Sequence, residues 1–200
     1  MDILHQDKEI IVCIKPVGVG SEDGPGSLPA LLKQALGGEI YPVHRLDTAV
    51  GGVMVYARTK QAAAALSKVI QEGAMVKEYR CMVHGTPEPS GDWTDLLFKD
   101  SRKNKVFVVK KERRGVKSAR LEFERLTDTD PALIHVRLHT GRSHQIRVQF
   151  ASRGFPLVGD HKYGSRDVRT APLLFSCRLT FPWHGKTLSF EAFPDWDSVH

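Results

Sequence analysis

The amino-acid sequence predicts an α+β domain with a mixed, largely antiparallel sheet and a few flanking helices. Three observations support this class. Many short segments alternate apolar and polar residues, which is the two-residue period of a β-strand. Only three segments have the spacing of an amphipathic helix, and turn residues separate strand after strand, as in hairpins. Two hundred residues are enough to bury a good core, so we expect residues 1–200 to form a single domain.

In the first part of the chain, capping residues mark where each helix begins and ends. Ser27 and Thr59 stand where a hydroxyl accepts the free backbone N–H groups of a helix start. Gly37 and Gly73 stand at or just beyond the helix ends, where glycine is favoured. The elements expected here are, in chain order, a strand over 9–16, a helix over 28–36, a strand over 51–57, a helix over 60–73 and a strand over 77–85.

The second part of the chain is richer in strands. Ala119, Leu121 and Phe123 recur at every second position, so they share the inward face of one strand. Ile146 and Phe150 are four residues apart, which places them on one face of a helix. The elements expected here are strands over 105–111, 118–126 and 131–141, a helix over 142–154, and a closing hairpin over 172–193 that turns at His184 and Gly185.

Positive charge is concentrated in one segment. The formal net charge is +6 and the pI is about 9.3. Residues 99–125 hold eleven Lys or Arg against four Asp or Glu, whereas the rest of the chain holds 18 basic and 19 acidic residues. Such a segment is typical of proteins that bind a polyanion, because neutralised phosphates release counterions. Solvated basic hairpins have the same pattern, so by itself it favours nucleic acid only slightly.

The composition argues against several other classes of protein and of site. No apolar run approaches the roughly 18 residues that a membrane span needs, and the N-terminus does not resemble a signal peptide. Three widely separated cysteines in apolar stretches are typical of reduced core residues in a cytoplasmic protein. His139 and His144 have no third ligand at a useful spacing. We therefore expect a cytoplasmic protein that uses no membrane, no metal and no cofactor.

Two opposite charges stand at the mouth of a predicted strand, in "HRLDTAVGGVMV" (residues 44–55). Arg45 and Asp47 are two residues apart, so on an extended backbone they point to the same face. A carboxylate beside a guanidinium stays ionised, and in a water-poor cleft it can act as a nucleophile or a base. A structural Arg–Asp ion pair in a loop is the alternative interpretation.

Two further groups of residues are candidates for a site. Residues 138–164 place Arg142, His144 and Arg147 around the first turns of a predicted helix, where backbone N–H groups and cations favour an anion. The polar outer face of a helix explains each of them equally well. Tyr79 stands on the apolar face of its strand in "KEYRCMVHG", where a tyrosine is more often core. A functional tyrosine would line a cleft and stack on a ring.

In this order, these segments resemble the RluA-type RNA pseudouridine synthases. "HRLDTAVGGVMVYART" is similar to the signature of that family, "KEYRCMVHG" to its strand with the active-site tyrosine, and "LHTGRSHQIRVQFASRGFPLVGDHKYG" to its long downstream motif. "IIVCIKPVGV" resembles its opening strand and Lys-Pro turn. The family usually has Thr-Ser-Gly where this chain has Val50-Gly51-Gly52, and His where it has Gln149. The resemblance implies the pseudouridine synthase fold with a central catalytic cleft, and residues 1–8 leave no room for the S4-type RNA-binding domain of many members.

The resemblance also implies roles for individual residues. Asp47 would be the catalytic carboxylate, Arg147 its buried salt-bridge partner, and Tyr79 the ring that stacks on the target uracil. Arg45 would help to expel the target nucleotide. Glycines after Asp47 would let the RNA backbone approach closely. The residues expected to bind the substrate are Arg45, His44, Arg142, His144, Gln145, Lys110, Lys111, Arg113 and Arg114.

The expected partner is RNA, either ribosomal or transfer RNA. A stem-loop is favoured because it presents unpaired bases for flipping into a pocket, and we expect the protein to act as a monomer. Two alternatives belong to other classes. A non-catalytic RNA-binding or chaperone module would keep the fold without turnover. An RNA hydrolase would use Asp47 and a histidine as general acid and base, and would leave cleaved strands.

Overall fold

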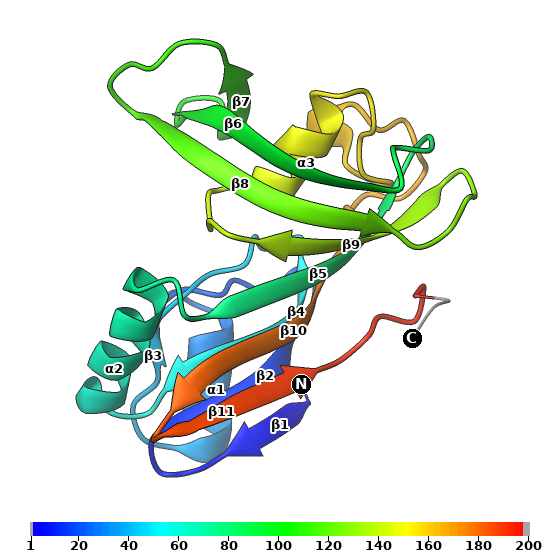
Figure 1. Cartoon of the computed structure of the whole chain (residues 1–200). Helices are drawn as coiled ribbons and strands as arrows, with labels where there is room; N and C mark the ends of the chain where they lie inside the picture. Colours follow the sequence, from blue (N-terminus) through cyan, green and yellow to red (C-terminus); the bar gives the residue numbers. More distant parts are fainter. Residues whose placement is uncertain (1, 198–200) are drawn as a thin grey trace. The chain divides into compact units, whose positions relative to one another are not determined.

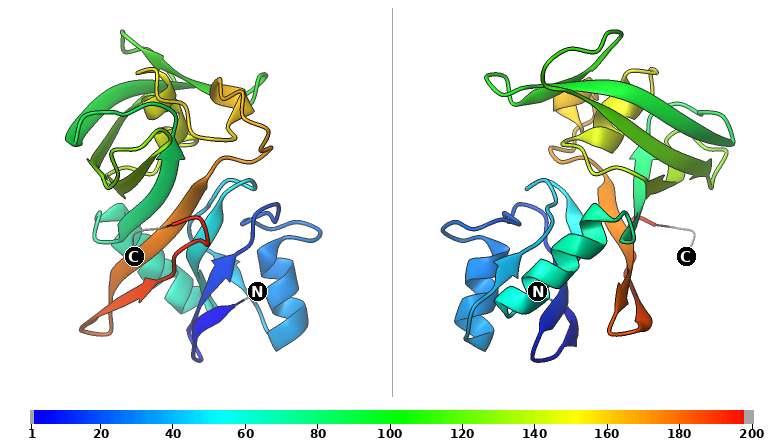
Figure 2. Two further views of the ribbon diagram at one scale, coloured as in Figure 1. Left: turned by 90° about the vertical axis from the view of Figure 1, so that its right-hand side faces the viewer. Right: turned by 60° about the vertical axis from the view of Figure 1, so that its left-hand side comes forward.

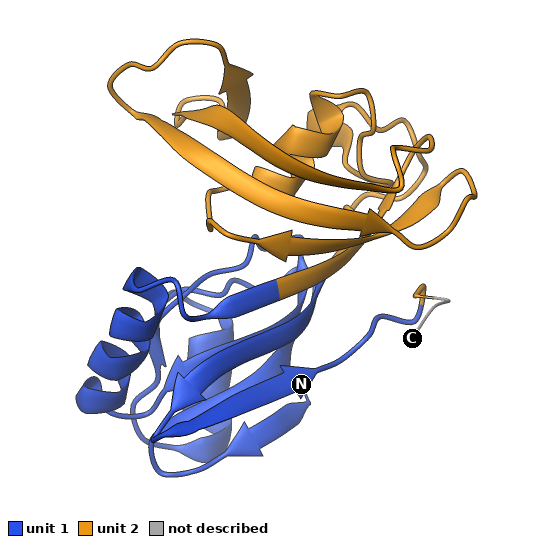
Figure 3. Cartoon of the chain, in the orientation of Figure 1, with its two compact units in different colours: residues 1–77, 175–195 blue, residues 78–174, 196–200 orange. Residues whose placement is uncertain are grey.

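The computed structural model describes residues 2–197 (Figure 1). The chain divides into two compact units (Figure 3). Unit 1 contains residues 1–77 and 175–195, and unit 2 contains residues 78–174 and 196–200. Strands β5 (Val76–Val83) and β10 (Leu174–Trp183) have residues in both units, and each unit is described below by itself.

Unit 1 is a sheet with two helices. Its strand order is β1 (Ile3–Gln6), β2 (Ile10–Lys15), β4 (Gly51–Ala57) and β10 (Leu174–Trp183). β3 (Tyr41–Pro42) pairs with β4, and β11 (Lys186–Glu191) forms a hairpin with β10. The β4–β10 pair is parallel, and the other pairs are antiparallel.

Helices α1 (Leu28–Leu36) and α2 (Lys60–Gln71) flank the sheet of unit 1 (Figure 2). Ser27 and Thr59 cap them by accepting the backbone N–H groups of Ala30 and Ala62, as predicted. Leu66 of α2 packs into a core built by alternate residues of β2, β4 and β10. Every residue of β4 is buried, which is typical of a strand covered on both faces.

Unit 2 is a twisted antiparallel sheet with one short helix. The strand order is β5 (Val76–Val83), β9 (Ala132–Leu138), β8 (Val116–Arg125), β6 (Ser90–Asp100) and β7 (Lys105–Val109). Helix α3 (Gln145–Ala151) and the 3-10 turn η1 (His161–Tyr163) follow β9. Trp93, Phe123 and Phe150 form an aromatic cluster with ring centroids 4.4–5.3 Å apart, which joins α3 to the sheet.

The mixed, largely antiparallel α+β class is confirmed, and most elements lie where the pattern placed them. The prediction was wrong at several places. Strands β1, β3 and β6 were not predicted, the strand expected over 105–111 ends at Val109, and α3 spans Gln145–Ala151 rather than 142–154. The late start of α3 has a local cause, because His144 has a left-handed backbone (φ 50°) that a helix cannot include.

The structure agrees with the sequence on the cysteines, and it adds two observations. Cys13, Cys81 and Cys177 are buried, and none of them forms a disulfide within the described residues. Between residues 2 and 197, no helix has the length and apolar character that crossing a bilayer requires. The same residues contain no group of three or more His, Cys, Asp or Glu side chains arranged to hold a metal ion.

Candidate active site

Asp47 lies in unit 1, in the loop that leads into β4. The loop closes as a turn in which Val50 N–H donates to the carbonyl of Asp47 at 2.9 Å. The carbonyl of Thr48 accepts the N–H of Gly18 at 2.8 Å, so the loop is also tied to the segment that follows β2. These backbone bonds fix the position of Asp47 relative to the end of β2.

Lys15, the last residue of β2, also ties the Asp47 loop to the segment that follows β2, through hydrogen bonds of its buried side chain. Its side chain is fully buried, and Nζ donates to the carbonyls of Pro16 (2.9 Å), Val19 (2.7 Å) and Thr48 (3.3 Å). Burial lowers the pKa of Lys15 to about 8, and the nearby carboxylate of Asp47 opposes that shift. Lys15 was not among the predicted site residues, although its Lys-Pro turn was part of the motif.

The two glycines after Asp47 serve the sheet rather than the substrate, which corrects the prediction that they admit RNA backbone. Both are buried. A Cβ on Gly52 (φ 128°) would lie 2.4 Å from the backbone N and O of Ser176 in β10. A Cβ on Gly51 would lie 3.3 Å from the ring of Phe175. Gly52 is therefore required by the close approach of the parallel strand.

Arg45 forms an ion pair with Glu22 at 2.8 Å, and both side chains are about half exposed. No ion pair joins Arg45 to Asp47 within the described part of the chain, so the local pair inferred from their spacing was wrong. Spacing fixes only the side of the backbone, whereas the Glu22 loop reaches Arg45 from a distant part of the sequence. An exposed pair of this kind contributes little to stability.

His44 contacts the protein backbone. Its Nε2 accepts the N–H of Val55 at 3.1 Å. Along this edge, β10 pairs with β4 only at Gly51 and Gly52, and β3 pairs only at Tyr56 and Ala57. His44 therefore satisfies a strand N–H in the gap between them. Burial, together with the charge of Lys77, lowers the pKa of His44 to about 3, so the ring is neutral at physiological pH.

In unit 2, Arg147 forms a buried bidentate ion pair with Asp160. Nε lies 2.7 Å from Oδ2, and one terminal nitrogen lies 2.8 Å from Oδ1. Arg147 is 6% exposed and Asp160 1% exposed. Asp160 belongs to the "PLVGD" turn of the downstream motif, but its role was not predicted. Two parallel hydrogen bonds fix the plane of the guanidinium as well as its position.

Tyr163 links this pair to His144. The guanidinium carbon of Arg147 lies 5.2 Å from the centroid of the Tyr163 ring. The Tyr163 hydroxyl accepts the N–H of Val106 and lies 2.8 Å from Nδ1 of His144. The structure thus brings together two predicted residues, Arg147 and His144, through two that were not predicted, Asp160 and Tyr163.

Gln145 and Gln149 organise the two ends of α3. Gln145 Oε1 accepts from the Thr140 hydroxyl (2.8 Å) and from Arg142 N–H (3.0 Å), and Nε2 donates to the Arg120 carbonyl. Gln149 is fully buried and donates to Asp95 at 2.7 Å. Arg142 donates its Nε to the carbonyl of Ser118 at 2.8 Å. The contacts of Gln145 are with protein groups, and its role in binding the substrate stays a prediction.

The remaining predicted residues lie in unit 2. Tyr79 is in β5 and is 7% exposed. The four basic residues lie in the loop between β7 and β8, and their side chains are exposed. In this loop the guanidinium carbon of Arg113 lies 4.5 Å from the centroid of the Phe98 ring. The loop residues are Lys110, Lys111, Arg113 and Arg114.

Comparison with known proteins gives the class to which this fold and these motifs belong. The family model described as RNA pseudouridylate synthase matches residues 9–152. The chain belongs to this family.

Individual relatives agree, and they support the RluA type. The dual-specificity RNA pseudouridine synthase RluA of Escherichia coli (strain K12) is 34% identical, covering 97% of this chain and 93% of the relative. An uncharacterized RNA pseudouridine synthase of Aquifex aeolicus (strain VF5) is 32% identical, covering 92% of this chain but 64% of the relative. A similar protein of Chloroflexus aurantiacus is 38% identical, and the chain spans 51% of its length. Among solved structures, human RNA Pseudouridylate Synthase Domain Containing 4 has a TM-score of 0.80 at 26% identity, covering 98% of this chain and 89% of that one.

Proposed function

We propose that this protein is an RNA pseudouridine synthase, an isomerase that converts uridine in structured RNA to pseudouridine. The observation that supports this function is the family match over residues 9–152, a range that contains Asp47, Tyr79 and Arg147. The identity to RluA extends over nearly the full length of both proteins. We propose further that the two units work as one catalytic domain.

The reaction breaks the bond between the ribose and N1 of uracil, rotates the base and joins the ribose to C5. N1 gains a proton and C5 loses one, so no atom is added and no cofactor is required. In the proposed mechanism Asp47 is the carboxylate that starts the reaction, by attacking the sugar or by acting on it as a base. Lys15 acts as a positioning residue, because it holds the Asp47 loop through Thr48 and places a positive group near the carboxylate.

Residues of unit 2 are assigned by their motifs. Tyr79 stacks on the extruded uracil, and stacking of this kind contributes about 1–3 kcal/mol, which offsets part of the unstacking of the target base. In this proposal Arg147 supplies positive charge to the carboxylate of Asp47, and Asp160 and Tyr163 fix the orientation of the Arg147 guanidinium. Arg45 occupies the place that the target base vacates, and its exposed pair with Glu22 gives way easily.

We propose ribosomal or transfer RNA as the substrate, with the target uridine in a stem-loop. The name of one relative, a dual-specificity RNA pseudouridine synthase, supports an RNA substrate, and that of another, a ribosomal large subunit pseudouridine synthase D that is 31% identical, supports ribosomal RNA. The basic loop between β7 and β8 supplies phosphate contacts that set affinity rather than sequence choice. In this proposal the enzyme acts as a cytoplasmic monomer.

Tritium release tests the function even though the target uridine is unidentified. RNA from cells lacking this gene, labelled at uracil C5, is incubated with wild-type protein and with Asp47→Ala. Joining the ribose to C5 expels that hydrogen, so we expect release by the wild type and none by Asp47→Ala, although the variant still binds RNA. Shortened RNA would indicate a hydrolase instead. Binding by the wild type without release would indicate the non-catalytic binding module.

A further inference from the structure

One face of the sheet in unit 2 has a small cavity. The register of the paired strands determines which side chains line it. Leu97 of β6 lies opposite Lys117 of β8, and Lys99 lies opposite Val106 of β7. Directly paired residues point to the same face, as do residues two apart on one strand. These four side chains therefore share one face, the face on which Val148 of α3 packs against Leu97 and Val106.

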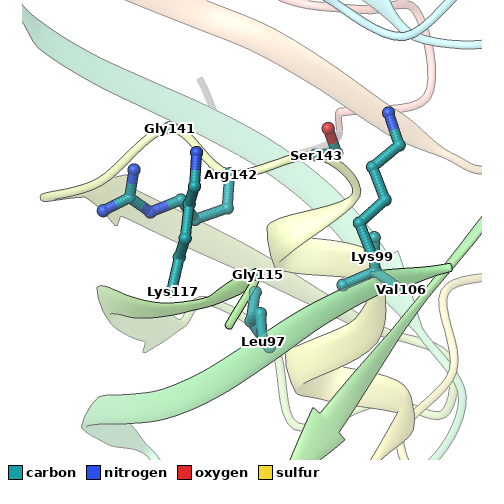
Figure 4. Close-up of a pocket in the computed structure, with 8 residues that line it drawn as sticks. All are labelled: Leu97, Lys99, Val106, Gly115, Lys117, Gly141, Arg142 and Ser143. Carbon is teal, nitrogen blue, oxygen red and sulfur yellow. The ribbon is translucent and has the colours of Figure 1, made fainter. Parts of the chain in front are cut away.

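The cavity opens where this face meets the loop before α3 (Figure 4). It has a volume of about 180 Å³, and Gly115, Gly141, Arg142 and Ser143 complete its wall. In Figure 4, Lys99 and Lys117 rise on either side of Leu97, with Arg142 beside Lys117 and the Ser143 hydroxyl on the Lys99 side. Buried Leu97 and Val106 form an apolar floor.

The cations of this cavity are not neutralised by the protein. Within residues 2–197, neither Lys99 nor Lys117 has an ion-pair partner, and the Arg142 side chain donates only to a backbone carbonyl, that of Ser118. Neighbouring arginines differ in this respect. Arg120 is paired with Asp92 and Glu122, and Arg153 with Asp95. Three cations around one concavity repel one another unless an anion lies between them.

We propose that this cavity is a phosphodiester subsite, which binds one backbone phosphate of the RNA outside the target nucleotide. This proposal rests on the proposed function and names a contact that the family motifs do not include, because Lys99 and Lys117 lie outside them. Arg142 and the two lysines donate to the phosphate oxygens, and the Ser143 hydroxyl adds a neutral donor.

Size and composition favour a phosphate over a base. Pockets that enclose drug-sized ligands or cofactors measure about 300–1,000 Å³, and this cavity is smaller. No aromatic ring lines it, so a base would have no stacking surface. No carboxylate lines it either, so no negative charge in the lining would repel a phosphate. A compact group with negative charge, such as a phosphate, therefore fits this cavity better than a base does.

The test uses the double variant Lys99→Met/Lys117→Met, which keeps the aliphatic stems and removes both charges. Its affinity for the target RNA is measured between about 0.1 M and 1 M salt. Log K falls as log salt rises, and removal of one phosphate contact makes this slope shallower by about 0.7–0.9. Relative to the wild type, the variant therefore loses roughly five- to eightfold more affinity at 0.1 M salt than at 1 M salt. Each single variant should give most of this loss, because the two lysines share one phosphate.

The matched control is Lys60→Met/Lys186→Met, which removes two exposed charges from unit 1. The subsite would be overturned if the two double variants had equal RNA affinity and equal salt slope. It would also be overturned if the slope changes of the two single variants added up to about 1.4–1.8, because that sum corresponds to two separate phosphate contacts.

Titration with inorganic phosphate, followed by the NMR amide signals of Gly115 and Gly141, tests the subsite without RNA. We expect saturable shifts in the wild type that the double variant loses, and their absence from the wild type would also overturn the proposal. Failure of the proposed function would appear separately, as no tritium release by the wild type.

Discussion

At the scale of single residues, Lys15 determines how the Asp47 loop is held. It is one of few fully buried charged side chains, and its ammonium group donates to three backbone carbonyls. Burial lowers its pKa from 10.5 to about 8. The charged form is therefore less favourable in the folded protein than in the unfolded chain, where the pKa keeps its ordinary value.

This pKa shift predicts a pH dependence of stability. Between pH 8 and 10.5 the unfolded chain binds more protons at Lys15 than the folded protein does, so the free energy of unfolding should rise with pH in this window. A shift of this size corresponds to an increase on the order of 3 kcal/mol. Urea unfolding of wild type and Lys15→Met at several pH values measures it, because groups common to both proteins cancel. Parallel pH profiles for the two proteins would contradict the shift.

Sequence reasoning at this scale found the motifs that contain the candidate residues, but it did not identify the groups that these residues contact. The motif containing His44, Arg45 and Asp47 was found, yet Arg45 pairs with Glu22 and His44 bonds the backbone of Val55. The spacing of neighbours along the chain determines which side of the backbone a side chain takes. It says nothing about a partner such as Glu22, which loop closure brings from elsewhere in the sequence.

At the scale of elements, α3 and η1 form one assembly. Seven residues are too few for a stable isolated helix, so α3 depends on its tertiary contacts. The Arg147–Asp160 pair joins α3 to the turn before η1, and the Gln149–Asp95 bond joins it to β6. The start of α3 also depends on tertiary structure. His144, whose left-handed backbone immediately precedes the helix, is held by its contact with Tyr163.

The buried pair predicts a large effect of a small substitution. Asp160→Asn removes the charge but keeps the shape, and it takes away the carboxylate that accepts two hydrogen bonds from the buried Arg147 guanidinium. Breaking such a pair destabilises a protein by about 3–5 kcal/mol, so we expect a loss of this order in urea unfolding. Asp92→Asn is the matched control, because Asp92 also forms a bidentate pair, with Arg120, but on the surface. Equal and small losses in both variants would mean that the Arg147 pair is not desolvated.

Element prediction succeeded where a local rule was strong. Ser27 and Thr59 cap their helices, and His184 and Gly185 have the positive φ values of a tight hairpin turn. It failed at β6. The sequence of this strand, "SGDWTDLLFKD", contains charged residues, and most of its residues are exposed or only partly buried. β6 is a strand because β7 and β8 pair with it on both sides, and such pairing is non-local information that a sequence window does not contain.

At the scale of the whole molecule, charge is separated along the sequence. Residues 99–125 carry an excess of seven positive charges, eleven against four, and the rest of the chain has 18 basic and 19 acidic residues. The structure assigns this segment to the end of β6, to β7 and β8, and to the exposed loop between β7 and β8. A field of this kind attracts a polyanion at long range and speeds its association.

Charge reversal of that loop tests whether it contacts RNA. Changing Lys110, Lys111, Arg113 and Arg114 to Glu should weaken RNA binding at least tenfold near 0.1 M salt, and it should lower the salt slope by about 0.7–0.9 for each phosphate that the loop no longer binds. Stability should change little, since the side chains are exposed. The same reversal of four exposed lysines in unit 1, at Lys8, Lys60, Lys68 and Lys186, alters net charge equally and serves as the control. If both quadruple variants lose affinity to the same extent, net charge alone explains the effect. A slope unchanged from the wild type would place the loop in solvent, away from RNA.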